Sequence, residues 1–119
     1  MIQARLTQDS KGNITAFEGK GHSGYAESGS DIVCAAVSVL SCTCVNALES
    51  VLGIRPNIWG GDDGFLAFTL PELDDAAMDR AQILMKALKQ GLDDVACEYP
   101  RNLHVSIQRL STHERRKST

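Results

Sequence analysis

Apolar and polar residues alternate near the start of the chain, where Ile2, Ala4 and Leu6 are each followed by a polar residue. Such alternation is typical of a half-buried β-strand. The segment 9–13 combines Asp, Ser, Gly and Asn, which are turn-forming residues, and residues 14–18 then resemble a returning strand. The pattern therefore predicts a β-hairpin.

Two longer segments show helical periodicity. The first is expected to be capped by Ser30 or Asp31 and to end at Gly53. Its apolar residues recur every three or four positions: Val33, Val37, Leu40, Cys44, Leu48 and Val51. The second segment follows Pro71 and extends to about Val95, with Gly91 in its interior as a mild cost to helix stability.

Three further strands complete the predicted pattern. Residues 56–59 and 65–70 form two strands around a Gly-rich turn, and Pro56 favours either an edge position or a later start for the first. Residues 103–107 alternate again and form the last strand. The order ββαββαβ predicts an α+β fold, in which two long helices cover a mainly antiparallel sheet of about five strands.

Composition restricts the class of protein. The chain has 119 residues, so we expect a single domain over residues 1–110 and a polar, basic, flexible tail over 111–119. A net charge of −3 argues against nucleic acid as a direct partner. We see no apolar run of about 18 residues and no secretory signal, so we expect a cytoplasmic protein without a membrane segment, whose four cysteines are free thiols.

Cys34 and His22 are the candidate catalytic residues. Cys34 is expected in the first turn of the first helix, where unpaired N–H groups and the helix dipole favour a thiolate. His22 lies twelve residues upstream, in the Gly-rich loop expected over residues 19–30. A histidine beside a cysteine supplies a general base, and the helix N-terminus offers donors for an oxyanion. Asp31 either orients His22 or only caps the helix.

The residues around this pair resemble a known family. Residues 21–24, Gly-His-Ser-Gly, and 31–38, Asp-Ile-Val-Cys-Ala-Ala-Val-Ser, are similar to the signature of the ribosomal-processing cysteine protease family (Prp, YsxB-like). Residues 45–54 also resemble the remainder of that family's first helix. The similarity extends over about residues 1–110, whereas Cys42, Cys44 and the basic tail depart from the family pattern.

The resemblance implies a cytoplasmic endopeptidase that removes the N-terminal extension of a large-subunit ribosomal protein. It assigns Cys34 as the nucleophile and His22 as the base, with Asp31 and Ser38 in supporting positions. It also implies a homodimer and a mobile substrate loop between the two catalytic residues. The loop residues of interest are Gly21, Ser23, Gly24, Gly29 and Ser30.

The remaining candidate groups have simpler explanations. Cys42 and Cys44 are two residues apart on a helix, so they point in different directions and do not suit one zinc ion. We expect one of them to be buried and the other to be tolerated at the surface, and we expect Cys97 to be buried. His104 should point outward, as a surface or dimer contact and the reserve base. Carboxylates at residues 62–63 suit a turn better than a metal site.

We expect neither a metal nor another cofactor, since no phosphate-binding glycine motif is present. Trp59, Phe65 and Phe68 are expected in the core or at a dimer interface. Two other functions remain open beside the protease. One is a non-catalytic ribosome-assembly module that binds a peptide at the helix N-terminus. The other is a redox sensor that uses the Cys34 thiol.

Overall fold

The fold is α+β with the element order ββαββαβ, as the sequence predicts. It was obtained as a computed structural model that describes residues 1–21, 28–60 and 65–111. The basic tail from residue 112 onward lies outside these ranges, so the prediction of a flexible tail stays a prediction.

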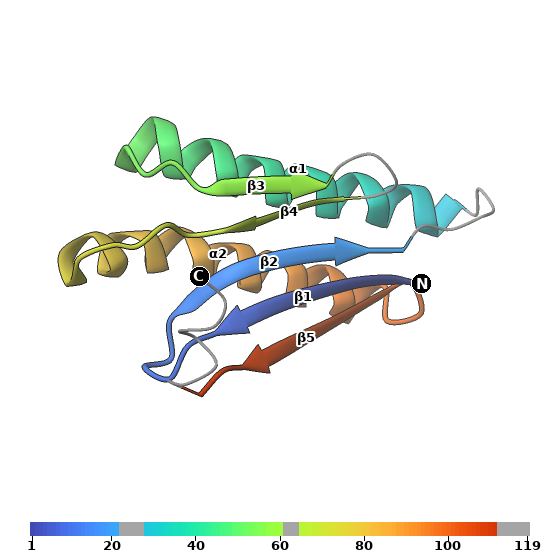
Figure 1. Cartoon of the computed structure of the whole chain (residues 1–119). Coiled ribbons are helices and arrows are strands. Elements are labelled where there is room, and N and C mark those ends of the chain that lie inside the picture. Colours follow the sequence, from blue (N-terminus) through green and yellow to red (C-terminus); the bar gives the residue numbers. More distant parts are fainter. Residues whose placement is uncertain (22–27, 61–64, 112–119) are drawn as a thin grey trace.

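Five strands form one sheet, in the spatial order β3-β4-β2-β1-β5 (Figure 1). Their bounds are β1 Ile2–Gln8, β2 Ile14–Lys20, β3 Asn57–Gly60, β4 Leu66–Thr69 and β5 Leu103–Arg109. Neighbouring strands are antiparallel except β1 and β5, which run parallel with Ile2 opposite Leu103. The short β3 is an edge strand, which confirms the prediction made from Pro56.

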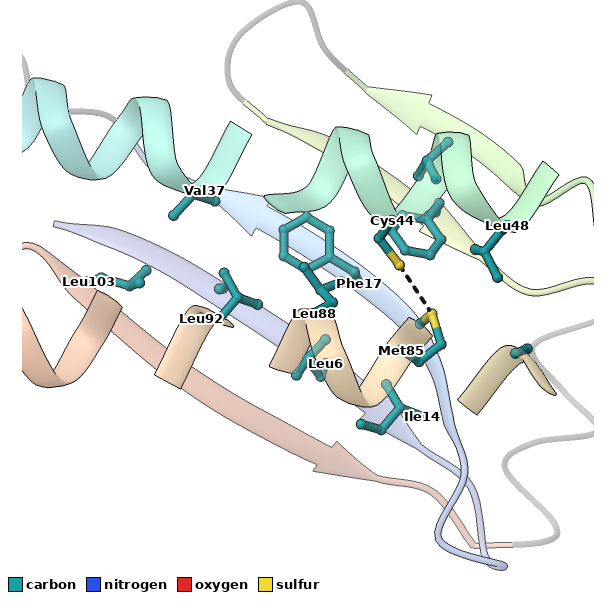
Figure 2. Close-up of a cluster of buried hydrophobic side chains, with 14 of the residues drawn as sticks. Leu6, Ile14, Phe17, Val37, Cys44, Leu48, Met85, Leu88, Leu92 and Leu103 are labelled. Carbon is teal, nitrogen blue, oxygen red and sulfur yellow. Dashed lines mark hydrogen bonds between the residues drawn. The ribbon is translucent and has the colours of Figure 1, made fainter. Parts of the chain in front are cut away.

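Two long helices, α1 (Ser28–Leu52) and α2 (Asp75–Glu98), cover the same face of the sheet (Figure 1). The core lies between the helices and the inward-facing residues of the strands (Figure 2). Its largest fully buried side chains include Phe17 and Phe68, whose ring centroids are 5.9 Å apart. The alternation of residues 2–6 is explained by this arrangement, since Ile2, Ala4 and Leu6 are all buried.

The helix ends follow local rules of capping. Gly53 has φ +68°, a left-handed conformation that suits glycine and ends α1 where the sequence predicts. Asp74 caps α2, because its carboxylate accepts a hydrogen bond of 2.8 Å from the Ala77 N–H. Val51 fits the predicted series of inward-facing residues of α1, yet it is exposed. The reason is that it lies in the last turn of this helix.

A buried glutamine ties the N-terminal hairpin to α2. The pairing of β1 with β2 shifts register between Thr7 and Gln8, where Gln8 faces Ile14. At this irregularity the Ile14 N–H donates to Gln82 Oε1 at 2.7 Å, and Gln82 Nε2 donates to the Ile14 carbonyl at 2.9 Å. The side chain thereby satisfies both backbone groups of a strand residue within the core.

Gly91 allows α1 and α2 to pack closely, a role that its low helix propensity does not reveal. A Cβ placed on Gly91 would lie 2.6 Å from Leu40 Cδ2 of α1, so α1 and α2 approach closely at this point. The absent side chain lets Leu40 pack onto α2, which offsets the propensity cost noted from sequence.

The apolar character of α1 is greater than we expected. Residues Ile32–Leu52 have a mean hydropathy of 1.8 and are long and apolar enough, by length and composition, to cross a membrane. The expectation that no such run exists was therefore wrong, because Ser, Thr and Cys interrupt the run without adding charge. This is weak evidence for a membrane, since helices that cover a core pass the same test.

Candidate active site

Cys34 lies further inside its helix than predicted. Helix α1 begins at Ser28, so Ser30 and Asp31 are helical residues and not its caps, and Cys34 lies in the second turn. Small polar residues suit the first turn of a helix as well as a loop, and composition alone therefore did not locate the boundary. The free N–H groups at the start of α1 belong to its first turn, which precedes the turn that carries the thiol.

The Cys34 side chain is half-buried and packs against the core from the edge. Its neighbours Val33 and Val37 are fully buried, whereas Ala35 is exposed. The thiol therefore lies at the border between the core-facing and outward sides of α1. This position gives it a rigid attachment together with partial access from outside, as a nucleophile requires.

The backbone at the end of β2 leads directly to the candidate base. Gly21 has φ +89°, and a Cβ there would lie 2.5 Å from the Met1 carbonyl oxygen, so only glycine fits without movement of β1. The next residue is His22. Figure 1 shows that the end of β2 and the N-terminal end of α1 lie at the same end of the molecule. The strand that precedes His22 and the helix that carries Cys34 thus have these two ends at the same end of the molecule.

Three of the predicted site residues, His22, Ser23 and Gly24, lie outside the described residues. The contact between His22 and Cys34 therefore stays a prediction. Gly29 and Ser30 belong to the first turn of α1, and not to the loop in which we expected them. The loop is shorter at its other end too, because β2 extends to Lys20. Asp31 is helical in its backbone, and its proposed role toward His22 stays untested.

Ser38 follows Cys34 by one helical turn and is exposed. Residues four apart on a helix lie on the same side, so Ser38 and Cys34 are neighbours along α1. The Ser38 carbonyl accepts a hydrogen bond of 3.2 Å from the Ser41 hydroxyl. The supporting role of Ser38 stays a prediction.

One contact near this end of the sheet was missed by the sequence analysis. Phe65 packs over Gly19 of β2 so closely that a Cβ on Gly19 would lie 2.6 Å from the Phe65 Cβ. The ring therefore lies close to the last residues of β2, just before the segment that carries His22. A glycine inside a strand often marks a close approach of this kind, and that signal was present at Gly19.

The other thiols differ in burial. Cys44 is buried and Cys42 is exposed, which confirms the prediction that one of the two would be buried and the other tolerated at the surface. Burial raises the pKa of the Cys44 thiol from 9.0 to about 11, and its sulfur contacts Met85 Sδ at 3.8 Å (Figure 2). Cys97 is exposed, so the prediction of its burial was wrong. It lies in the last turn of α2 on the outward side of the helix, whereas Ala96 and Tyr99 pack against the core.

His104 is exposed on β5, as the strand alternation predicts. Among the aromatic candidates, Phe68 is fully buried, Phe65 is half-buried and Trp59 is exposed on β3. Within residues 1–21, 28–60 and 65–111, no three His, Cys, Asp or Glu side chains gather where they could hold a metal ion. The candidate for chemistry among the described residues remains the Cys34 thiol, which is half-buried and packs against the core.

Comparison with known proteins agrees with this chemistry. A family model described as "Cysteine protease Prp" matches residues 1–104. The ribosomal processing cysteine protease Prp of Bacillus subtilis is 36% identical over 108 residues, covering 89% of this chain and 96% of the relative. Its counterpart in Staphylococcus aureus is 30% identical, covering 91% of this chain and 100% of the relative.

Solved structures show the same fold. The protein SMU.848 from Streptococcus mutans superimposes with a TM-score of 0.80 at 32% identity, covering 92% of this chain and 96% of that one. The essential ribosomal processing protease Prp from S. aureus, solved in complex with a substrate peptide, gives a TM-score of 0.79 at 28% identity. That match covers 91% of this chain and 100% of the S. aureus chain. The same S. aureus protease has also been solved with a covalently linked product peptide.

Proposed function

The chain belongs to the ribosomal-processing cysteine protease (Prp) family, and on that premise we propose that it removes the N-terminal extension of a large-subunit ribosomal protein. In this proposal Cys34 is the nucleophile and His22 is the general base. The class of enzyme, a cysteine-type peptidase, follows from the family itself. The substrate and the two residue roles are the proposed part.

The position of Cys34 is the observation that carries the residue assignment. It is half-buried on a long helix, at the end of the molecule where β2 leads into the segment with His22 (Figure 1). Of the other thiols, Cys44 is buried in the core and burial raises its pKa. The partial exposure of Cys34 near the start of α1 supports its assignment as the nucleophile.

The reaction follows from these two groups. His22 accepts the Cys34 proton, and the thiolate attacks the carbonyl carbon of the scissile peptide bond. The resulting imidazolium returns the proton to the leaving amine, and an acyl-enzyme is left on Cys34. His22 then activates a water molecule, which hydrolyses the thioester and releases the acid product.

The substrate class rests on the relatives. The B. subtilis and S. aureus proteins are ribosomal processing proteases, and the S. aureus enzyme has been solved with a substrate peptide. A peptidase of this kind acts on a newly made ribosomal protein, so we place the chain in the cytoplasm. We further propose a homodimer that binds neither nucleic acid nor membrane directly, in accord with the net charge of −3.

An intact-mass assay tests the proposal directly. An N-terminally extended large-subunit ribosomal protein is incubated with the wild type, Cys34→Ala, or Cys97→Ala as a matched control in which an exposed thiol is removed. We expect one defined cut near the substrate's N-terminus with the wild type and the control, and none with Cys34→Ala. Cleavage by Cys34→Ala, or a substrate that the wild type binds and never cleaves, would contradict the proposal.

A further inference from the structure

Gly21 directly precedes His22, and two features of its backbone require glycine. Its φ of +89° lies in the left-handed region, which residues with a side chain rarely adopt. In addition, a Cβ on Gly21 would lie 2.5 Å from the carbonyl oxygen of Met1 and 3.6 Å from the Cα of Ile2. Real Cβ atoms essentially never come closer than 3.0 Å to such an atom, so any other residue at this position forces a displacement.

The start of β1 is held too firmly to be the part that moves. Ile2 is only 2% exposed and lies in the core, opposite Leu103 of β5. Its N–H donates a hydrogen bond of 2.9 Å to the Asn102 carbonyl, so the peptide group between Met1 and Ile2 is fixed from the side of β5. The oxygen that a Cβ on Gly21 would meet belongs to this same peptide group. A residue with a side chain would therefore displace its own chain and not β1.

The pairing of β2 makes β1 the reference for the end of this strand. Pairing with β4 ends at Glu18, whereas pairing with β1 continues to Lys20. Continuing that register by one position places Gly21 opposite Ile2, in agreement with the close contact between them. In the described part of the sheet, the direction in which the chain leaves β2 thus follows from its pairing with β1.

We propose that Gly21 is a positioning residue for catalysis, which directs the chain from β2 into the segment with His22 while the Met1 carbonyl serves as its fixed point of contact. Both constraints on Gly21 come from the protein's own backbone and not from a ligand. The proposal rests on the proposed function, in which His22 accepts the proton of Cys34.

The expected effect follows from the distance over which a general base acts. The base must come within about 2.6–3.2 Å of the atom whose proton it takes. A displacement of about 1 Å from the productive geometry can lower the rate by about 100-fold. A change of chain direction one residue before His22 is therefore enough to separate the base from Cys34 while the core of the fold stays intact.

Gly12 provides a matched control for backbone strain. Its φ is +88°, nearly that of Gly21, but nothing lies within 4 Å of a Cβ placed there. It lies in the turn between β1 and β2, at the opposite end of both strands from Gly21 (Figure 1). Alanine at Gly12 therefore introduces the same strain in φ without the close contact and away from the candidate active site.

Cleavage kinetics on an N-terminally extended large-subunit ribosomal protein compare the two positions. Gly21→Ala should lower kcat and kcat/KM together by about 100-fold, as expected when an interaction of the transition state is lost. Gly12→Ala should leave both constants unchanged. Circular dichroism checks that each variant is folded. Gly21→Asn serves if Gly21→Ala is not, because asparagine tolerates a positive φ and still adds the Cβ.

Alkylation of Cys34 gives a second readout, which needs no substrate. A histidine that accepts the thiol proton makes the sulfur more reactive at mildly acidic pH. The rate at which iodoacetamide modifies Cys34, followed by peptide mass spectrometry, should fall in Gly21→Ala to the rate in His22→Ala. Gly12→Ala should react at the rate of the wild type. A purely structural role of Gly21 would not change this rate in the folded protein.

Three results would overturn the inference and leave the proposed function intact. The first is cleavage by the Gly21 variants at the rate of Gly12→Ala, and the second is an effect confined to KM, which would make Gly21 a substrate contact. The third is unfolding of both Gly21 variants while Gly12→Ala folds, which would show a structural role. Full cleavage by His22→Ala would instead overturn the proposed function, and this inference with it.

Discussion

Replacing Gln82 by leucine tests how the N-terminal hairpin is held on α2. Gln82 is only 5% exposed, and its amide group satisfies both the N–H and the carbonyl of Ile14, at 2.7 and 2.9 Å. Leucine has a similar volume and fits an apolar core, so the substitution removes the hydrogen bonds while creating little empty space. Its effect should therefore report mainly on the two backbone groups that lose their partner.

The expected magnitude follows from those two groups. A buried polar group that loses its hydrogen-bond partner costs about 1–3 kcal/mol. Two such groups give about 2–4 kcal/mol if the hairpin relaxes enough to admit water to one of them. This is a large part of the 5–15 kcal/mol that stabilises a typical domain, so Gln82→Leu should move the urea midpoint far below that of the wild type.

Equilibrium urea unfolding, followed by circular dichroism, is the measurement. Gln90→Leu provides the matched control, because Gln90 is on the same helix but exposed, with its amide bonded to Asp94 at 2.8 Å. We expect a change of less than about 0.5 kcal/mol for this control. If Gln82→Leu has the same free energy of unfolding as Gln90→Leu at an unchanged m-value, the two hydrogen bonds to Ile14 do not contribute the expected stabilisation.

Three further predictions concern packing and thiols. Gly91→Ala should destabilise the protein by about 1–2 kcal/mol in the same urea assay, because the overpacking against Leu40 costs more than the gain in helix propensity. A stabilised variant would show that the Leu40 side chain changes its rotamer without cost. The pKa of the Cys44 thiol is about 11 in the folded protein and 9.0 in the unfolded chain. The protonated thiol therefore contributes its full stabilisation below pH 9, and this contribution is lost as the pH rises to about 11. The stability difference between the wild type and Cys44→Ala should shrink over that window, and a constant difference would contradict the pKa shift. At pH 8, mass spectrometry should find iodoacetamide on Cys97 in the folded protein and on Cys44 only after unfolding; equal labelling of both would show that the core admits the reagent.

Periodicity predicted the fold well where one side of an element is buried. Local rules explain the alternation at Ile2, Ala4 and Leu6, and they explain the helix ends at Gly53 and Asp74. The element order was obtained correctly for this reason. The parallel pairing of β1 with β5 was not predicted, because it joins residues about a hundred positions apart and leaves no local signal.

The site was predicted less completely than the fold. Motif spacing identified Cys34, but the start of α1 was placed three to four residues too late, since Ser and Gly fit both a loop and a helical first turn. The prediction that Cys97 is buried was wrong because residue type gives only an average tendency, and Cys97 lies on the outward side of α2. The close approaches at Gly19 and Gly91 depend on which side chain lies opposite, which a single sequence does not state.

The position of β1 between β2 and β5 has a consequence for how the protein is made. Among the described strands β1 is translated before the others, yet one of its two edges is paired by β5, which is translated after them. Until residues 103–109 emerge, that edge of β1 presents unpaired N–H and carbonyl groups, which invite pairing with other chains. Sheets that depend on such distant pairings fold slowly. Each nascent chain therefore passes through an interval in which β1 is open to misassembly, and any truncation before Leu103 would make that interval permanent.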